Sequence, residues 1–217
     1  RRMPHLLPSN IADTQQDNTR AGTCAAAALL VDISGFTALT ESLMKYGNEG
    51  AEVLTEILNS LYNPLIDEIF RQGGFVTAYA GDSFTALFPE TLVKPYDSCL
   101  FTAVFINSFF KKNPVCRTKF GDYGIAARSG IASGEVRWRI AGGDVSDAAD
   151  AGHSDLVYFF YGEAIELCCK AQYFAEKNET VAHPDFLKCV SGLCEHSEVS
   201  GNSDYKRIIK ISAQENP

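Results

Sequence analysis

An aspartate at residue 32 stands between an apolar run and a segment with helical periodicity. The run, residues 25–31, predicts a buried strand, and the apolar residues of the following segment fall on one face of a helix. A carboxylate at a strand end, followed by backbone N–H groups at a helix start, places a cation ligand beside an anion-binding turn. The segment therefore favours chemistry on a metal-bound polyphosphate. The alternative is a solvated Asp32 beside a helix capped by Ser34.

A second acid, Asp82, lies between two short apolar runs, Phe75–Ala80 and Ser83–Phe88. A Gly-Asp pair between such runs predicts a tight hairpin turn. If this hairpin neighbours the Asp32 strand, as in split βαβ sheets, the two carboxylates converge. Two divalent ions about 4 Å apart suit in-line attack on a phosphoryl group. Turn chemistry alone is the competing explanation of Asp82.

The elements that would position these acids follow from hydrophobic periodicity and glycine. The predicted elements are a strand at 24–32, a helix to 45, a helix at 49–71 with Pro64 inside it, the hairpin around Asp82, a helix at 96–111, a strand pair at 124–133 and 135–140 turning at Gly134, a strand at 156–161, a helix at 162–176, and strands at 180–182 and 205–211. This order predicts an α+β domain, a ferredoxin-like split βαβ fold with a largely antiparallel sheet and helices packed on one face.

Composition limits the classes of function. The chain has 217 residues and a net charge of −8 without a basic cluster, so we expect no nucleic-acid partner, and an acidic protein that handles phosphates needs metal ions. Its apolar runs are far shorter than the roughly 20 residues of a membrane span. Seven cysteines without disulfide spacing favour reduced thiols in a cytoplasmic protein.

We interpret residues 1–22 as a leader or linker, residues 23–217 as the domain, and the start at Arg1 as a sign of a fragment.

Two further groups of residues have metal-ligand side chains. Cys189, Cys194 and His196 could supply three zinc ligands, although no fourth is evident nearby. The segment 142–155 is most simply an acidic loop, and calcium is the alternative; its acids are Asp144, Asp147, Asp150 and Asp155.

Three motifs together resemble the catalytic domain of class III adenylyl and guanylyl cyclases. They are the segment Val31-Asp32-Ile33-Ser34-Gly35-Phe36-Thr37, then Gly73-Gly74, then Ala80-Gly81-Asp82 before an apolar strand. The resemblance covers residues 25 to 190. Within the family it is strongest to the first cyclase domain of the soluble, bicarbonate-responsive adenylyl cyclases, which also carry a Gly-Ala-Glu like that at residues 50–52.

The resemblance implies a role for each matching residue. Asp32 and Asp82 match the two metal-binding aspartates, with the Ile33 carbonyl assisting one of two Mg²⁺ or Mn²⁺ ions. Arg128 stands where a phosphate-contacting Lys or Arg is found. The triphosphate-binding turn corresponds to Ser34, Gly35, Phe36 and Thr37. The implied reaction is attack of the ribose 3′-hydroxyl of a nucleoside triphosphate on its α-phosphate with release of pyrophosphate. ATP is favoured over GTP, and the residues do not settle the choice between them.

The sequence departs from the family pattern at the residues of the partner half of the site. Ala78 replaces an adenine-contacting Lys. If Gly162 is the glycine that opens the family's helix, Phe159, Glu166 and Lys170 stand where a polar adenine contact, an Asn and an Arg are usual. Phe cannot make that hydrogen bond, Glu opposes a developing phosphate charge, and Lys lacks the guanidinium fork. Ala78 and Cys169 also replace the basic bicarbonate contacts, which makes bicarbonate sensing doubtful.

The cyclases of this class build each active site between two domains. A chain with the metal half alone is expected to work beside a second cyclase domain, in tandem or as a heterodimer, with little or no activity by itself. One alternative is a non-catalytic module that binds nucleotide or dimerises to regulate a neighbour. Another is a two-aspartate enzyme such as a diguanylate cyclase, because Ala80-Gly81-Asp82-Ser83-Phe84 resembles its hairpin.

Overall fold

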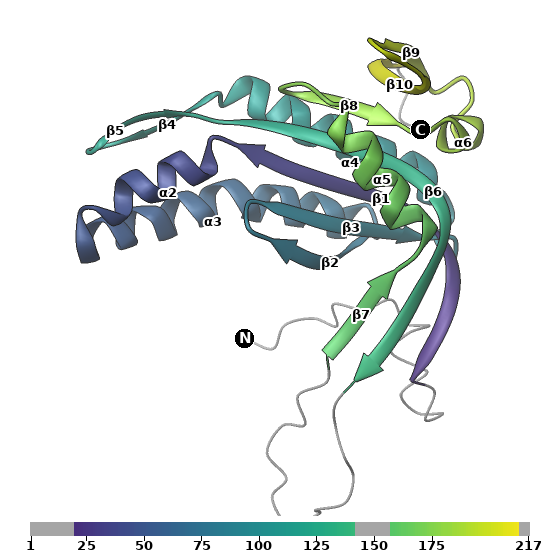
Figure 1. Cartoon of the computed structure of the whole chain (residues 1–217), viewed down its shortest axis with the longest axis horizontal. Coiled ribbons are helices and arrows are strands. Elements are labelled where there is room, and N and C mark those ends of the chain that lie inside the picture. The colour runs from purple at the N-terminus through teal and green to yellow at the C-terminus, as the bar shows by residue number, and fades with distance from the viewer. Residues whose placement is uncertain (1–19, 142–156, 213–217) are drawn as a thin grey trace, which may run out of the picture.

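The computed structural model describes residues 20–141 and 157–212 (Figure 1). An eight-stranded sheet runs through the domain in the order β2-β3-β1-β6-β8-β10-β9, and β7 pairs with β6. The only parallel pairing among the described strands joins β6 to β8. The strands of this sheet are β1 (Ala21–Ser34), β2 (Phe75–Ala80), β3 (Ser83–Pro89), β6 (Ala126–Ala141), β7 (Val157–Tyr161), β8 (Glu179–Ala182), β9 (Cys194–Val199) and β10 (Asn202–Ile211).

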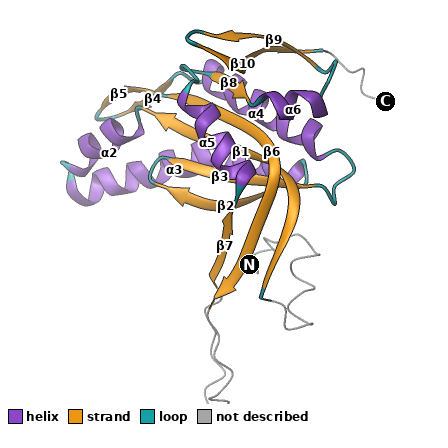
Figure 2. Ribbon diagram, turned by 45° about the vertical axis from the view of Figure 1, so that its right-hand side comes forward, coloured by secondary structure: helices purple, strands orange, loops and turns teal. Residues whose placement is uncertain are grey.

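Within the described residues, five helices cover the sheet (Figure 2). They are α2 (Phe36–Met44), α3 (Gly47–Arg71), α4 (Pro95–Lys112), α5 (Glu163–Tyr173) and α6 (Pro184–Cys189). Side chains alternate between the two faces of a strand, so β1 contributes to two cores. Leu29 and Val31 pack with α2, α3 and α4, whereas Ala26 and Ala28 pack with Ala164 and Cys168 of α5.

The predicted α+β class with a largely antiparallel sheet is confirmed, and one detail of it is corrected. The helices do not all lie on one face, because α5 covers the face opposite α2, α3 and α4. Small residues on α5 and β6 permit this second layer. A Cβ placed on Gly130 of β6 would lie 2.1 Å from the Cys168 carbonyl oxygen, so the helix backbone rests almost on the sheet.

The predicted turn at Gly134 is wrong. Residues 126–141 form one long strand, which pairs with β1 without interruption and sets Gly134 opposite Ala26. The glycine serves close packing instead, since a Cβ there would lie 3.2 Å from the Ala164 backbone nitrogen at the start of α5. The sequence correctly marked Gly134 as a position that requires glycine. The reason is the close approach of the start of α5, 30 residues further along the chain, and not a turn.

The sequence analysis missed three short elements. They are the hairpin of β4 (Val115–Thr118) and β5 (Gly121–Gly124), helix α6 and strand β9. The acidic loop at 142–155 lies outside the described residues, as does most of the predicted leader, whose last two residues begin β1. Within the described ranges, none of the helices combines the length and apolar character needed to cross a membrane.

Candidate active site

The two predicted aspartates lie side by side at one end of the sheet. Strand β1 is hydrogen-bonded between β3 and β6, and Asp32 stands opposite Ser83, the residue after Asp82. The backbone N–H of Ile33 donates to the Asp82 carbonyl oxygen at 3.1 Å. Strand adjacency, the condition on which convergence of the two acids depended, is therefore met.

The turn after Asp32 is shaped by Gly35. Its φ of 90° is in the left-handed region, and a Cβ there would lie 2.1 Å from the Gly124 carbonyl oxygen. Gly35 is the N-cap of α2, and no side chain caps this helix, so the expectation of a Ser34 cap does not hold. The first N–H groups of α2 thus remain available to an anion, as the phosphate-binding role requires.

Thr37 links the turn to the second acid. Its hydroxyl Oγ1 donates to Asp82 Oδ2 at 3.2 Å, from the first turn of α2 to the β2–β3 hairpin. This hydrogen bond fixes the Asp82 carboxylate beside the open helix end. The sequence predicted both residues for the site but not their contact.

Arg128 contacts the first acid directly. Its Nε donates to Asp32 Oδ2 at 3.0 Å and its Nη2 donates to the same oxygen, while Gln172 of α5 approaches that oxygen at 3.5 Å. The Asp32 side chain is 19% exposed, so the pair is screened only in part. The predicted phosphate contact therefore serves as counterion to a predicted metal ligand.

Charges alternate across four strands from this point. Asp32 on β1 stands opposite Arg128 on β6, and Arg128 stands opposite Glu179 on β8. Arg207 on β10 then donates from Nε to Glu179 Oε2 at 2.8 Å. Each of these charges therefore has an opposite charge on the neighbouring strand.

Sequence reasoning missed Tyr62 on α3. Its ring lies 6.4 Å from the Phe36 ring and 6.1 Å from those of Tyr79 and Phe84. Burial, followed by the negative charges of Asp82 and Asp32, raises the pKa of Tyr62 to about 12. The phenol therefore stays neutral near both acids, and its ring supports Phe36 of the turn. An aromatic residue with a polar tip on the helix after the motif was the only local signal.

Three of the four predicted partner-half residues lie on β7 and α5, whereas Ala78 lies on β2, the strand that leads into the Asp82 hairpin. Phe159 on β7 is 51% exposed, Glu166 and Lys170 are one turn apart on the outer face of α5, and Ala78 is exposed on β2. In the described part of the chain, no hydrogen bond or ion pair joins these four residues to Asp32 or Asp82.

A cavity of about 460 Å³ lies beside this partner half. Its lining includes Glu135, Glu163 and Glu166, against a single Arg137 that already donates to Glu135 at 2.7 Å. Excess negative charge repels a phosphate. The lining of this cavity therefore disfavours a phosphate.

The donor set of the two acids suits a hard cation. Carboxylate oxygens and a backbone carbonyl are the ligands that Mg²⁺ and Mn²⁺ prefer, and Mg²⁺ is usually held by one or two carboxylates together with substrate phosphates. Among the described residues no three or more His, Cys, Asp or Glu side chains gather, so the described part of the chain offers these two carboxylates. The same finding removes the alternative of a zinc site at Cys189, Cys194 and His196.

Known structures share this architecture. The guanylyl cyclase domain of the RhoGC fusion protein from Blastocladiella emersonii superposes with a TM-score of 0.68, at 15% identity over 90% of this chain and 99% of that one. The adenylyl cyclase CyaB from P. aeruginosa gives 0.65 at 16% identity, over 90% and 97%. The chain therefore has the class III adenylyl and guanylyl cyclase catalytic fold.

The sequence is similar to particular members of that class. Adenylate cyclase type 10 from Homo sapiens is 28% identical over 190 residues, and the Mus musculus protein is 27% identical, each over 85% of this chain. No family model matches the chain. It spans 11% of the length of these relatives. The predicted resemblance to soluble adenylyl cyclases is confirmed.

Proposed function

We propose that this chain is a nucleotide cyclase domain that supplies the metal-binding half of an active site shared with a second cyclase domain. The observation that carries the proposal is the placement of Asp32 and Asp82 at adjacent strand ends, beside the uncapped start of α2. We take ATP as the substrate because the relatives similar in sequence are named adenylate cyclases. The product would be cyclic AMP, with pyrophosphate leaving.

Each residue has a task in this reaction. Asp32, Asp82 and the Ile33 carbonyl would hold two Mg²⁺ or Mn²⁺ ions, which lower the pKa of the ribose 3′-hydroxyl and neutralise the leaving group. The N–H groups at the start of α2 donate to the triphosphate. Arg128 releases the Asp32 carboxylate and binds a phosphate oxygen instead. Its guanidinium can donate two hydrogen bonds to that phosphate. The 3′-hydroxyl releases its proton to solvent and its oxygen bonds to the α-phosphorus. The bond from the α-phosphorus to the oxygen that bridges to the β-phosphate breaks, and pyrophosphate leaves.

The partner requirement follows from what this half lacks. Phe159 has no hydrogen-bonding group for a base, and the glutamates around the cavity near α5 oppose the charge that develops on the phosphates. Two copies of this chain would combine two such halves. A second domain with the usual polar and basic residues would complete one site.

Complementation tests the proposal. The chain is mixed with a cyclase domain that carries the partner-half residues but has both of its own metal aspartates replaced by Ala, and cyclic AMP is measured with Mg²⁺ or Mn²⁺. We expect activity only in the mixture, and a loss of about a thousandfold with Asp32→Asn or Asp82→Asn. The matched control is Asp67→Asn, an exposed aspartate on α3. Activity that survives Asp32→Asn would remove the mechanism.

A non-catalytic module is the second candidate, favoured by the acidic cavity at α5 and by the ion pair that occupies Asp32. It predicts that a metal-bound ATP analogue raises the melting temperature of the chain while the mixture makes no cyclic AMP. The Asp32→Asn variant should then lose the thermal shift. Stabilisation together with turnover supports the cyclase half instead.

A further inference from the structure

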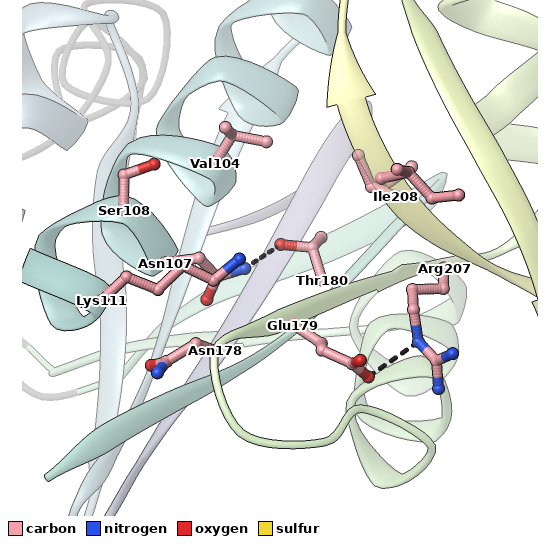
Figure 3. A pocket seen from close by; sticks show the side chains of 10 residues that line it. Val104, Asn107, Ser108, Lys111, Asn178, Glu179, Thr180, Arg207 and Ile208 are labelled. Atoms are coloured by element: carbon pink, nitrogen blue, oxygen red, sulfur yellow. Dashed lines mark hydrogen bonds and ion pairs between the residues drawn. The ribbon is translucent and has the colours of Figure 1, made fainter. Parts of the chain in front are cut away.

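A second cavity lies away from the candidate active site. It has a volume of about 310 Å³ and is bounded by α4, the start of β8 and β10 (Figure 3). None of its lining residues belongs to the two aspartates, the turn or the partner half. Hereafter it is called the α4–β10 pocket.

The inner wall of this pocket is polar and ordered. Asn107 is 6% exposed and Thr180 is 2% exposed, and the Asn107 amide donates to the Thr180 hydroxyl. Ser129 donates to Asn107 Oδ1 at 3.5 Å from the neighbouring strand. The Asn107 amide has a second N–H, and the Thr180 hydroxyl keeps its own hydrogen. Two buried side chains therefore present spare donors at fixed positions.

Two cations flank these donors. Lys111 of α4 and Arg207 of β10 lie on opposite sides of the Asn107–Thr180 pair in the view of Figure 3. Lys111 has no ion-pair partner among the described residues, and Arg207 uses only Nε for Glu179, which leaves both Nη groups to donate. With Glu179 counted, the lining carries one net positive charge in a chain of net −8.

The chemistry of a complementary ligand follows from this lining. Donors exceed acceptors, so the ligand must supply acceptor oxygens and negative charge. Val104 and Ile208 add an apolar wall, and the volume is at the small end of the range for ligand pockets. We propose that the α4–β10 pocket binds a small organic oxyanion, a carboxylate or phosphate monoester on a short apolar body, between Lys111 and Arg207.

The test is titration of the ¹⁵N-labelled chain, followed by NMR, with phenyl phosphate, with benzoate and with neutral benzamide, all in EDTA. We expect saturable shifts in residues 104–111 and 178–181 for one or both anions, with a Kd of about 1 mM or tighter, and none for benzamide. The two anions distinguish phosphate from carboxylate. Absence of saturable binding, or shifts confined to residues 32–37 and 82, would overturn the proposal.

Single substitutions test which cations of the α4–β10 pocket bind the oxyanion. Lys111→Met leaves every ion pair of the described residues intact and is expected to weaken binding about tenfold, whereas Lys112→Met, at the neighbouring exposed lysine outside the lining, should change nothing. Arg207→Gln should have a larger effect. Equal loss in the Lys111→Met and Lys112→Met variants would contradict a specific site.

Discussion

The two halves of the candidate active site differ in what each has kept. The metal half, β1 with its turn and the β2–β3 hairpin, has both the backbone geometry and the side chains for phosphate chemistry. The partner half, β7 with α5, has the backbone alone: Gly162 keeps a φ of 130° where a Cβ would lie 2.8 Å from the Glu135 carbonyl oxygen. A glycine that packing requires therefore fixes the backbone without fixing the chemistry of the side chains around it.

The largest expected effect comes from repairing the partner half. Phe159→Asp, Glu166→Asn and Lys170→Arg together restore a polar base contact, remove a repelling charge and supply a guanidinium fork. Cyclic AMP production by the chain alone, assayed with Mn²⁺ and ATP, should rise about a hundredfold or more.

The control for this repair is the same triple variant with Asp32→Asn added, which should produce no cyclic AMP. A triple variant that stays inactive, while the unmodified chain is active with a complementary domain, would mean that these three positions do not explain the asymmetry.

The turn of the metal half should be intolerant of a side chain. Gly35→Ala places a Cβ 2.1 Å from the Gly124 carbonyl oxygen at positive φ, so we expect a loss of about 3 kcal/mol in the free energy of unfolding, measured by urea denaturation. Gly81→Ala is the matched control: its φ is 64° with open space around it, and it should cost only about 1 kcal/mol. Equal losses would show that the contact with Gly124 does not constrain the turn.

Arg128 should lower the metal affinity of the free chain, because it neutralises Asp32. Arg128→Met is expected to tighten Mn²⁺ binding about tenfold in isothermal titration calorimetry without nucleotide, since a positive charge is removed from a partly buried carboxylate. Arg117→Met, at an exposed arginine, is the control. Weaker Mn²⁺ binding in the Arg128→Met variant would show that Arg128 supports metal binding and does not compete with the metal for Asp32.

The smallest effect concerns the outer face of α5. The adjacent Cys168 side chain lowers the pKa of Cys169 to about 7, whereas burial raises the pKa of the Cys24 thiol. A lowered pKa populates the thiolate at lower pH, so alkylation of Cys169 by iodoacetamide should rise to half its maximum near pH 7, and that of Cys24 only at higher pH. Peptide mass spectrometry across pH 5–9 measures both. Equal profiles would mean that Cys168 does not activate its neighbour.

Much of the metal half was predictable from local sequence. The apolar run before Asp32 and the Gly81-Asp82 pair between two strands are short-range signals, and both elements formed as expected. Their adjacency was a condition set by topology, which the β1–β3 register satisfies. The contacts of Thr37 with Asp82 and of Arg128 with Asp32 were not predictable, because each joins residues far apart in sequence.

Errors fell where long-range packing overrides a local signal. Gly134 was interpreted as a turn, yet continuous pairing with β1 keeps the strand extended and the start of α5 explains the glycine. Helices were placed on one face because the pattern of a single helix does not state which face of the sheet it will cover. The alternation of buried residues in β1 serves both layers.

The sequence alone determined the residue types: two acids at strand ends, a glycine turn, and a partner half without its polar base contact, its Asn and its Arg. These are local facts, since side-chain chemistry and the glycine requirement of a turn do not depend on distant contacts. The tertiary structure alone decided which groups meet: Asp32 with Arg128, Tyr62 near both acids, and Lys111 with Arg207 across a cavity. These contacts depend on the order of the strands and the placement of the helices, and both are set by burial of the apolar surface of the whole domain.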